Sequence, residues 1–205
     1  MPGEDHRDPT LPADARAAAL MAGMTLEEKC AQLTGIMLWS LVRADGSDAE
    51  TAEQALKTPP GHVAQLIADD PAQLTRLVGS IQRQFVTRTR LGIPALFHAE
   101  ALNGFLAGGH MVFPTAIGLA ATWSPGLTRE MADLIRQQMV RTGMRHALSP
   151  VMDVALDPRW GRVHETYGKT RTDRRLEGTF ELAGAARLLT STQRSFLSDA
   201  VTTSA

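Results

Sequence analysis

The sequence predicts an α/β fold with a parallel sheet, and three features of the chain lead to this class. Helix-like stretches of periodic apolar residues alternate with short apolar runs, which is typical of parallel strands covered by helices. With 205 residues and 43% apolar content, the chain is long enough to bury a sizeable core. Polar residues follow the apolar runs, where parallel α/β folds build their sites. Periodicity alone does not distinguish a barrel from an open sheet.

Two helices are predicted near the start of the chain. Pro12 begins an alanine-rich stretch that ends near Gly23. Thr25 and Glu28 then fit a capping box, in which the Thr25 hydroxyl accepts a hydrogen bond from the Glu28 N–H. The second helix carries Cys30, the only cysteine of the chain. An internal disulfide is therefore excluded, and we expect a buried structural thiol.

The middle of the chain predicts a loop, a long helix and a strand. Residues 43–62 are polar and include a Pro-Pro-Gly sequence, which favours a loop or a weak, interrupted helix. Asp70 as N-cap and Pro71 at the first helical position predict the next helix. The expected buried stripe of this helix comprises Leu74, Leu77, Val78, Ile81 and Phe85. The apolar run at residues 92–97 predicts a buried parallel strand.

The following segment predicts one more helix between two strands. Residues 117–122 form a short apolar run that we interpret as a strand. Ser124 and Pro125 begin a helix that Gly143 ends. Its expected buried face comprises Leu127, Met131, Leu134, Ile135 and Met139. Residues 146–154 predict a strand that continues into a loop.

Charge and hydropathy argue against several classes of partner and location. The 21 Lys and Arg residues balance 22 Asp and Glu residues, so neither nucleic acid nor an anionic membrane is expected as a partner. No stretch approaches the roughly 20 apolar residues of a membrane span. The charged first residues lack the apolar run of a signal peptide, which favours a cytoplasmic location. Motifs for dinucleotides, for phosphate loops and for zinc or serine hydrolases are absent.

Polar side chains gather where the strands are predicted to end. His98 and Glu100 follow one apolar run, and Asp153 and Asp157 follow the last one. Carboxylates suit sugars because each oxygen accepts from adjacent hydroxyls. His98 alone is interpreted as a hydrogen-bonded histidine at a strand end rather than a metal ligand.

One short loop adds further groups that suit a sugar. Its polar and aromatic side chains are Arg159, Trp160, Arg162, His164 and Glu165. Arginine supplies a planar fork of donors for hydroxyls, and a tryptophan ring stacks on a pyranose face. The alternative is a structural ion-pair network beside a core tryptophan.

Five segments, in order and spacing, resemble signatures of family 3 glycoside hydrolases. The resemblance extends over residues 8 to about 168. Its segments are residues 24–33 (MTLEEKCAQL), 90–104 (with RLGIP and FHAEALNG), 112–120 (VFPTAIGLA), 149–154 (SPVMDV) and 157–163 (DPRWGRV). The last is the most specific.

The resemblance implies a (β/α)8 TIM-type barrel, and this chain would contain only part of it. It also implies retaining hydrolysis of terminal β-glucosides or β-xylosides through a covalent glycosyl-enzyme. By motif position, Glu100 and Arg162 would bind hydroxyls of the innermost sugar. Asn103 stands where the family usually has histidine. No cofactor and no metal are implied. An unrelated barrel enzyme, such as an aldolase or a phosphate-binding isomerase, is disfavoured. The sequence lacks the surroundings of a Schiff-base lysine and a glycine-rich phosphate loop.

The resemblance stops after Gly168. The family continues Gly-Glu-Asp-Pro-Tyr, whereas this chain reads Gly-Lys-Thr-Arg-Thr from residue 168 to 172. Removing one G from GGN GAA GAC CCG TAC gives GGN AAG ACC CGT AC, which encodes the observed residues. We therefore predict that residues 1–168 are the N-terminal part of the barrel domain. Residues 169–205 are predicted to be an aberrant, frameshifted tail, and most of residues 171–205 are expected to pack poorly or to be irregular.

The missing later motifs bear on activity. In the family, an aspartate on a later strand is the nucleophile, and a glutamate, often in a following domain, is the acid/base. Neither motif is found in this chain, so no catalytic residue is assigned within it. The chain is thus expected to be a β-glycosidase by family that is inactive by itself, and the alternative is a sugar-binding remnant or a fragment without function.

Overall fold

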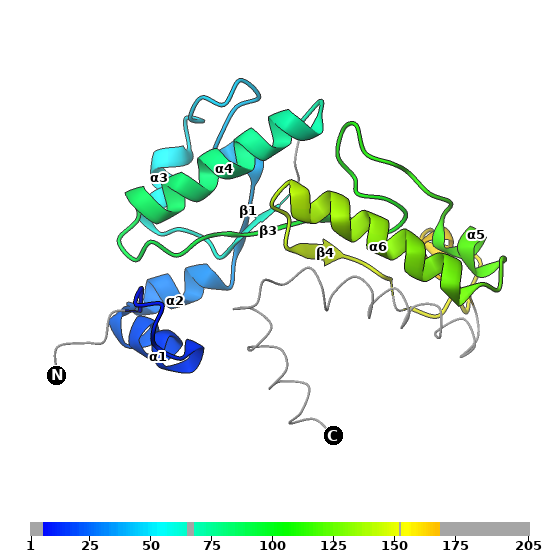
Figure 1. Cartoon of the computed structure of the whole chain (residues 1–205), viewed down its shortest axis with the longest axis horizontal. Helices are drawn as coiled ribbons and strands as arrows, with labels where there is room; N and C mark the ends of the chain where they lie inside the picture. The colour runs from blue at the N-terminus through cyan, green and yellow to red at the C-terminus, as the bar shows by residue number, and fades with distance from the viewer. Residues whose placement is uncertain (1–5, 65–67, 152, 169–205) are drawn as a thin grey trace.

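The computed structural model describes residues 6–64, 68–151 and 153–168 (Figure 1). Within them, four strands form one sheet in the order β1 (Gly35–Met37), β2 (His62–Ala64), β3 (Leu96–Glu100) and β4 (His146–Leu148). Each strand pairs in parallel with the next along the chain. The parallel α/β prediction is therefore confirmed. The predicted tail, residues 169–205, lies outside the described residues.

The helix α4 (Pro71–Arg88) forms as the sequence predicts. Asp70 caps it by accepting a hydrogen bond from the Gln73 N–H at 2.8 Å, and Pro71 occupies its first turn. All five residues of the predicted stripe are buried. They pack with Phe97 of β3 in the hydrophobic core, so α4 covers one face of the sheet.

The helix α6 (Pro125–Arg141) begins at the predicted Ser124 cap, but its buried face is rotated from the predicted one. Leu127 and Leu134 are both 45% exposed, so their assignment to the core is wrong. The residues that α6 buries are Thr128, Met131, Ala132, Ile135 and Met139. The small side chain of Ala132 lets the helix approach the core closely, which leaves the two leucines on its flank.

Gly143 ends this helix in a position that a larger residue could not occupy. Its φ is +90°, and a Cβ there would lie 2.7 Å from a methyl carbon of Val78. The chain therefore turns against α4 before entering β4, and Figure 1 shows α4 and α6 on the same side of the sheet.

The strand predicted at residues 92–97 begins later than expected. Gln82 of α4 donates its side-chain amide to the Ala95 carbonyl at 2.7 Å and accepts the Ala95 N–H at 3.0 Å. Since both backbone groups of Ala95 are used in this way, the strand ladder starts at Leu96. It then extends to Glu100. His98 and Glu100 thus belong to the strand instead of following it.

The strand predicted at residues 117–122 is wrong, because this run forms the short helix α5 (Ala116–Ala120). Ala116, Leu119 and Ala120 are buried while Ile117 is exposed, which is helical spacing. The interrupted-helix alternative for residues 43–62 is closer, since α3 (Ala52–Lys57) forms there. The three-residue strands β1 and β2 were not predicted, because they are too short to show alternation.

The first two helices are α1 (Ala13–Gly23) and α2 (Leu26–Gln32), near their predicted positions. Both hydrogen bonds of the predicted capping box are present. The expectation of a buried Cys30 is wrong, because this thiol is exposed. The helix α2 buries no residue within the described chain: its first residue, Leu26, is exposed, and so is Leu33 directly after its end.

Glu28 also joins α2 to the loop before β3, because Arg90 donates to its carboxylate at 2.8 Å. Hydrogen bonds from Arg90 and then from the Thr25 N–H lower the pKa of Glu28 from 4.5 to about 2. A lowered pKa stabilises the fold above pH 4.5, and this contribution is lost as the pH falls towards 2.

We therefore expect Glu28→Gln to lower the urea midpoint at neutral pH, and the difference from wild type to shrink as the pH falls below 4.5. Urea titrations at several pH values would measure this. The matched control is Glu53→Gln, which changes a carboxylate in the first turn of α3. A difference that is constant with pH would contradict the assignment.

The two faces of the sheet have different surroundings. Val63, Phe97 and Ala99 point into the core beneath the helices. Because strand side chains alternate, Leu96, His98 and Glu100 lie on the opposite face, where they are only partly buried. In a barrel, that face would line the axis. Among the described residues, no helix combines the length and apolar character needed to cross a membrane.

Candidate sugar site

Glu100 is the last residue of β3, at the carboxyl end of the parallel sheet. Its carbonyl accepts a hydrogen bond from the Leu106 N–H at 3.0 Å, which turns the chain sharply after the strand. The side chain lies on the face opposite the helices. The strand therefore holds the Glu100 carboxylate at the edge where parallel α/β proteins bind ligands.

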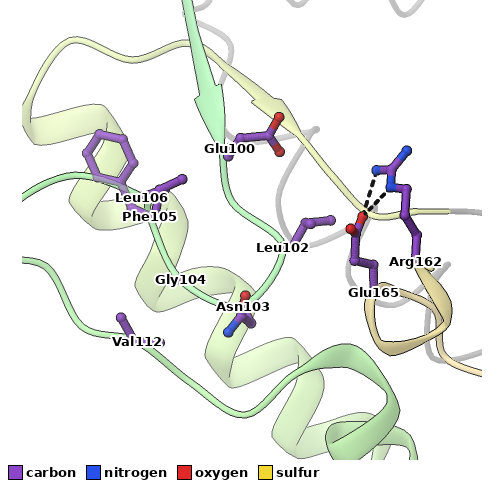
Figure 2. Close-up of a pocket in the computed structure, with 9 residues that line it drawn as sticks. All are labelled: Glu100, Leu102, Asn103, Gly104, Phe105, Leu106, Val112, Arg162 and Glu165. Atoms are coloured by element: carbon purple, nitrogen blue, oxygen red, sulfur yellow. Dashed lines mark hydrogen bonds and ion pairs between the residues drawn. The ribbon is translucent and has the colours of Figure 1, made fainter. Parts of the chain in front are cut away.

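Glu100 and Arg162 line the same cavity, although 62 positions separate them in the sequence. The cavity has a volume of about 220 Å³. Its lining residues are Glu100, Leu102, Asn103, Gly104, Phe105, Leu106, Val112, Arg162 and Glu165. Figure 2 shows the Glu100 carboxylate directed towards the side on which Arg162 and Glu165 lie. The structure thus brings the two predicted sugar-binding residues together.

The loop after β3 forms one wall of the cavity and is held by Asn103. The Asn103 side-chain amide donates to the Phe113 carbonyl at 3.0 Å, and the Phe113 N–H donates back to the Asn103 carbonyl at 2.7 Å. Gly104 has a φ of +137°, and a Cβ there would lie 2.6 Å from the Met111 carbonyl oxygen. An asparagine in this position therefore still fixes the loop by hydrogen bonding.

Arg162 is held at the opposite wall by Glu165. Arg162 directly precedes the 3-10 turn η2 (Val163–Glu165), of which Glu165 is the last residue. Glu165 Oε2 accepts from Arg162 Nε at 2.9 Å and from Nη2 at 2.6 Å. The turn is anchored because Tyr167 is buried in the core and the Ala155 N–H donates to the Gly168 carbonyl. Because Glu165 follows Arg162 by three residues, one turn brings the two side chains together. Glu165 therefore orients the Arg162 guanidinium.

The charged groups around the cavity shift each other's pKa. Burial raises the pKa of the Glu100 carboxyl, the charge of Glu165 raises it further, and Arg162 lowers it. Hydrogen bonds from Arg162 lower the pKa of Glu165. Within the described residues, Arg162 forms its ion pair with Glu165 and not with Glu100. In the part of the chain that the structure describes, the Glu100 carboxylate thus faces the cavity without a direct ion pair.

Other predicted site residues have different surroundings. Asp157 and Arg159 form an exposed ion pair, with Arg159 Nε 3.0 Å from both carboxylate oxygens, which fits the structural alternative. The charge of Asp153 contributes to raising the pKa of Arg162. His98 lies two residues before Glu100 on β3, beside the rings of two other histidines, so its placement at a strand end is wrong. The sequence did not reveal that the three histidine rings lie together, because such short strands give no periodic signal.

Comparison with known proteins places the fold in one family. Residues 25–180 match the model described as "Glycosyl hydrolase family 3 N terminal domain". This match runs past Gly168, where the sequence-based boundary was drawn. The chain is 34% identical over 186 residues to a periplasmic β-glucosidase/β-xylosidase of Dickeya chrysanthemi, covering 82% of this chain and 27% of that protein.

Further relatives agree with this match. A probable β-glucosidase C of Aspergillus flavus is 31% identical over 82% of this chain and 28% of its own length. A β-glucosidase structure from Erythrobacter marinus has a TM-score of 0.73 and 31% identity, covering 92% of this chain and 24% of that one. A mutant β-glucosidase of Listeria innocua in complex with laminaribiose has a TM-score of 0.66 and 25% identity, over 80% and 22% of the two chains.

The chain spans little more than a quarter of the length of the relatives that it matches. Its four parallel strands therefore correspond to part of a barrel. The Dickeya relative is named periplasmic, so the cytoplasmic location remains a prediction from the sequence.

Proposed function

This chain belongs to glycoside hydrolase family 3, and we propose that it is the front part of the catalytic barrel of a retaining β-glycosidase. In this proposal, Glu100 and Arg162 bind hydroxyls of a terminal β-linked glucose or xylose. The observation that carries the proposal is that both side chains line one cavity at the carboxyl end of the sheet. The named activities of the relatives, β-glucosidase and β-xylosidase, support the substrate class.

The chemistry of the cavity suits hydroxyl groups. Among the described residues, no cation forms an ion pair with the partly buried Glu100 carboxylate. Such a carboxylate is costly unless it accepts hydrogen bonds, and vicinal sugar hydroxyls supply two donors. Glu165 accepts from Nε and Nη2 of Arg162, so Nη1 is the donor that we assign to the sugar. The fixed guanidinium plane loses little freedom when it binds.

Cleavage needs groups that we place outside this chain. A retaining glycosidase uses two carboxyl groups about 5 Å apart, one as nucleophile and one as acid/base. We propose that both belong to later parts of the family barrel and the domain after it, and that residues 169–205 are read out of frame. The missing nucleophile motif also favours a second candidate function for this chain by itself, which is sugar binding without turnover.

Sugar binding by the chain tests this proposal. We expect laminaribiose to bind the purified chain in saturation-transfer NMR titrations, and Glu100→Gln to weaken binding about tenfold to hundredfold. This range corresponds to one charged hydrogen bond. The matched control is Glu130→Gln, an exposed carboxylate on α6, which should leave binding unchanged. Equal binding by wild type and Glu100→Gln would refute the role of Glu100.

A further inference from the structure

Three histidines from three neighbouring strands meet on the sheet face opposite the helices. They are His62 of β2, His98 of β3 and His146 of β4. The ring centroids of His98 lie 5.7 Å from those of both neighbours, and those of His62 and His146 lie 6.4 Å apart. One nitrogen from each ring lies within 4.8 Å of the other two.

The sheet register explains why these rings converge. His98 pairs directly with His146 across β3 and β4, and with Ala64 across β2 and β3. His62 lies two residues before Ala64, so alternation places it on the same face. All three side chains therefore form one layer, two residues along β3 from Glu100. The positions are set by strand backbone and not by a flexible loop.

Three imidazoles are an unusual way to fill such a layer. Barrel interiors are filled mainly by branched apolar side chains such as valine, isoleucine and leucine. Each imidazole instead brings two ring nitrogens, which need partners when they are removed from water. His62 and His98 are partly buried in the described structure. A shared cation would satisfy one nitrogen of each ring at once.

We propose that His62, His98 and His146 bind one divalent transition-metal ion, with Zn²⁺ as the best fit. Zinc binds imidazole nitrogens at about 2.0–2.1 Å, so three tetrahedral ligands stand about 3.4 Å apart. The ring nitrogens now lie within 4.8 Å of one another, so binding would draw them closer together. Three protein ligands leave a fourth position for water, and the ion would join β2, β3 and β4.

The charge state of the rings agrees with a cation. Burial lowers the pKa of His98 and of His146, and each ring is further disfavoured as a cation by the histidines beside it. Neutral imidazole offers the lone pair that a metal needs, whereas an anion would need protonated rings. This site is separate from the sugar cavity, whose lining includes none of the three histidines.

Metal titrations of the complete chain test the proposal without any sugar. We expect one Zn²⁺ per chain in competition with a chromophoric chelator, and a visible absorption band of tetrahedral Co²⁺. His98→Ala should weaken Zn²⁺ binding by more than about 100-fold, since loss of even an outer-shell partner costs 10–100-fold. His146→Gln changes a more exposed residue and provides a second variant if His98→Ala does not fold, as judged by circular dichroism.

The matched control is His110→Gln, which removes a histidine whose ring contacts Phe105 instead of the cluster. This variant should bind Zn²⁺ like wild type. The proposal is overturned if wild type shows no tetrahedral Co²⁺ band. It is equally overturned if folded His98→Ala and His146→Gln bind Zn²⁺ as tightly as wild type, or if His110→Gln loses as much affinity as they do.

Discussion

The purified 205-residue chain should show no turnover of aryl β-glucoside or β-xyloside above buffer. In our proposal, Glu100 and Arg162 bind sugar hydroxyls, and the two carboxyl groups that cleave the bond through a covalent glycosyl-enzyme lie outside this chain. A barrel of this type also needs about 250 residues to close, and the family match in this chain ends at residue 180.

The positive control is a gene in which the G that we propose to be missing after the Gly168 codon is inserted and the downstream sequence is included. That longer protein should hydrolyse one of the two aryl glycosides, measured by release of the chromophore. Rate enhancements by enzymes are at least about 10⁶-fold, so the contrast should be unmistakable. Robust turnover by the 205-residue chain, abolished by Glu100→Ala, would mean that the chemistry is assigned to the wrong residues.

Phe97→Ala should cost about 3–5 kcal/mol of unfolding free energy. Phe97 is fully buried on β3, in the core that α4 and α6 share with the sheet. Domains of this kind have only about 5–15 kcal/mol in total, so this variant should lose much of its cooperative unfolding. Urea titration followed by circular dichroism measures the change.

The matched control is Leu127→Ala on α6. The apolar pattern assigns Leu127 to the core, but its side chain is 45% exposed. Its removal should therefore cost well under half as much as that of Phe97. A larger cost for Leu127 than for Phe97 would contradict the observed orientation of α6.

Long elements could be predicted from the sequence because their signals are local. The cap at Asp70 and the stripe of α4 need only contacts within one helix and one apolar face, and both are present. The start of β3 could not be predicted in this way. It depends on the Gln82 side chain, which binds both backbone groups of Ala95 across the fold.

The candidate site, like the fold, could be predicted only in part from the sequence. Glu100 and Arg162 were selected by motif resemblance, and the structure places them on one cavity. The ion pair that holds Arg162 agrees with the structural alternative considered for its loop, although the sequence did not single out Glu165 as the partner. His62 gave no signal, because β2 has three residues and pairs only through tertiary contacts. Groups that meet across strands are set by register, which single-sequence patterns do not reveal.

The most direct test of the central claim is a double-mutant cycle on laminaribiose binding with Glu100→Gln, Arg162→Met and the double variant. If both side chains hold one sugar, the two losses should be non-additive, with a coupling free energy of about 0.5–3 kcal/mol. NMR titration of the four proteins measures it. Strictly additive losses, or no loss from Arg162→Met, would contradict a shared sugar site.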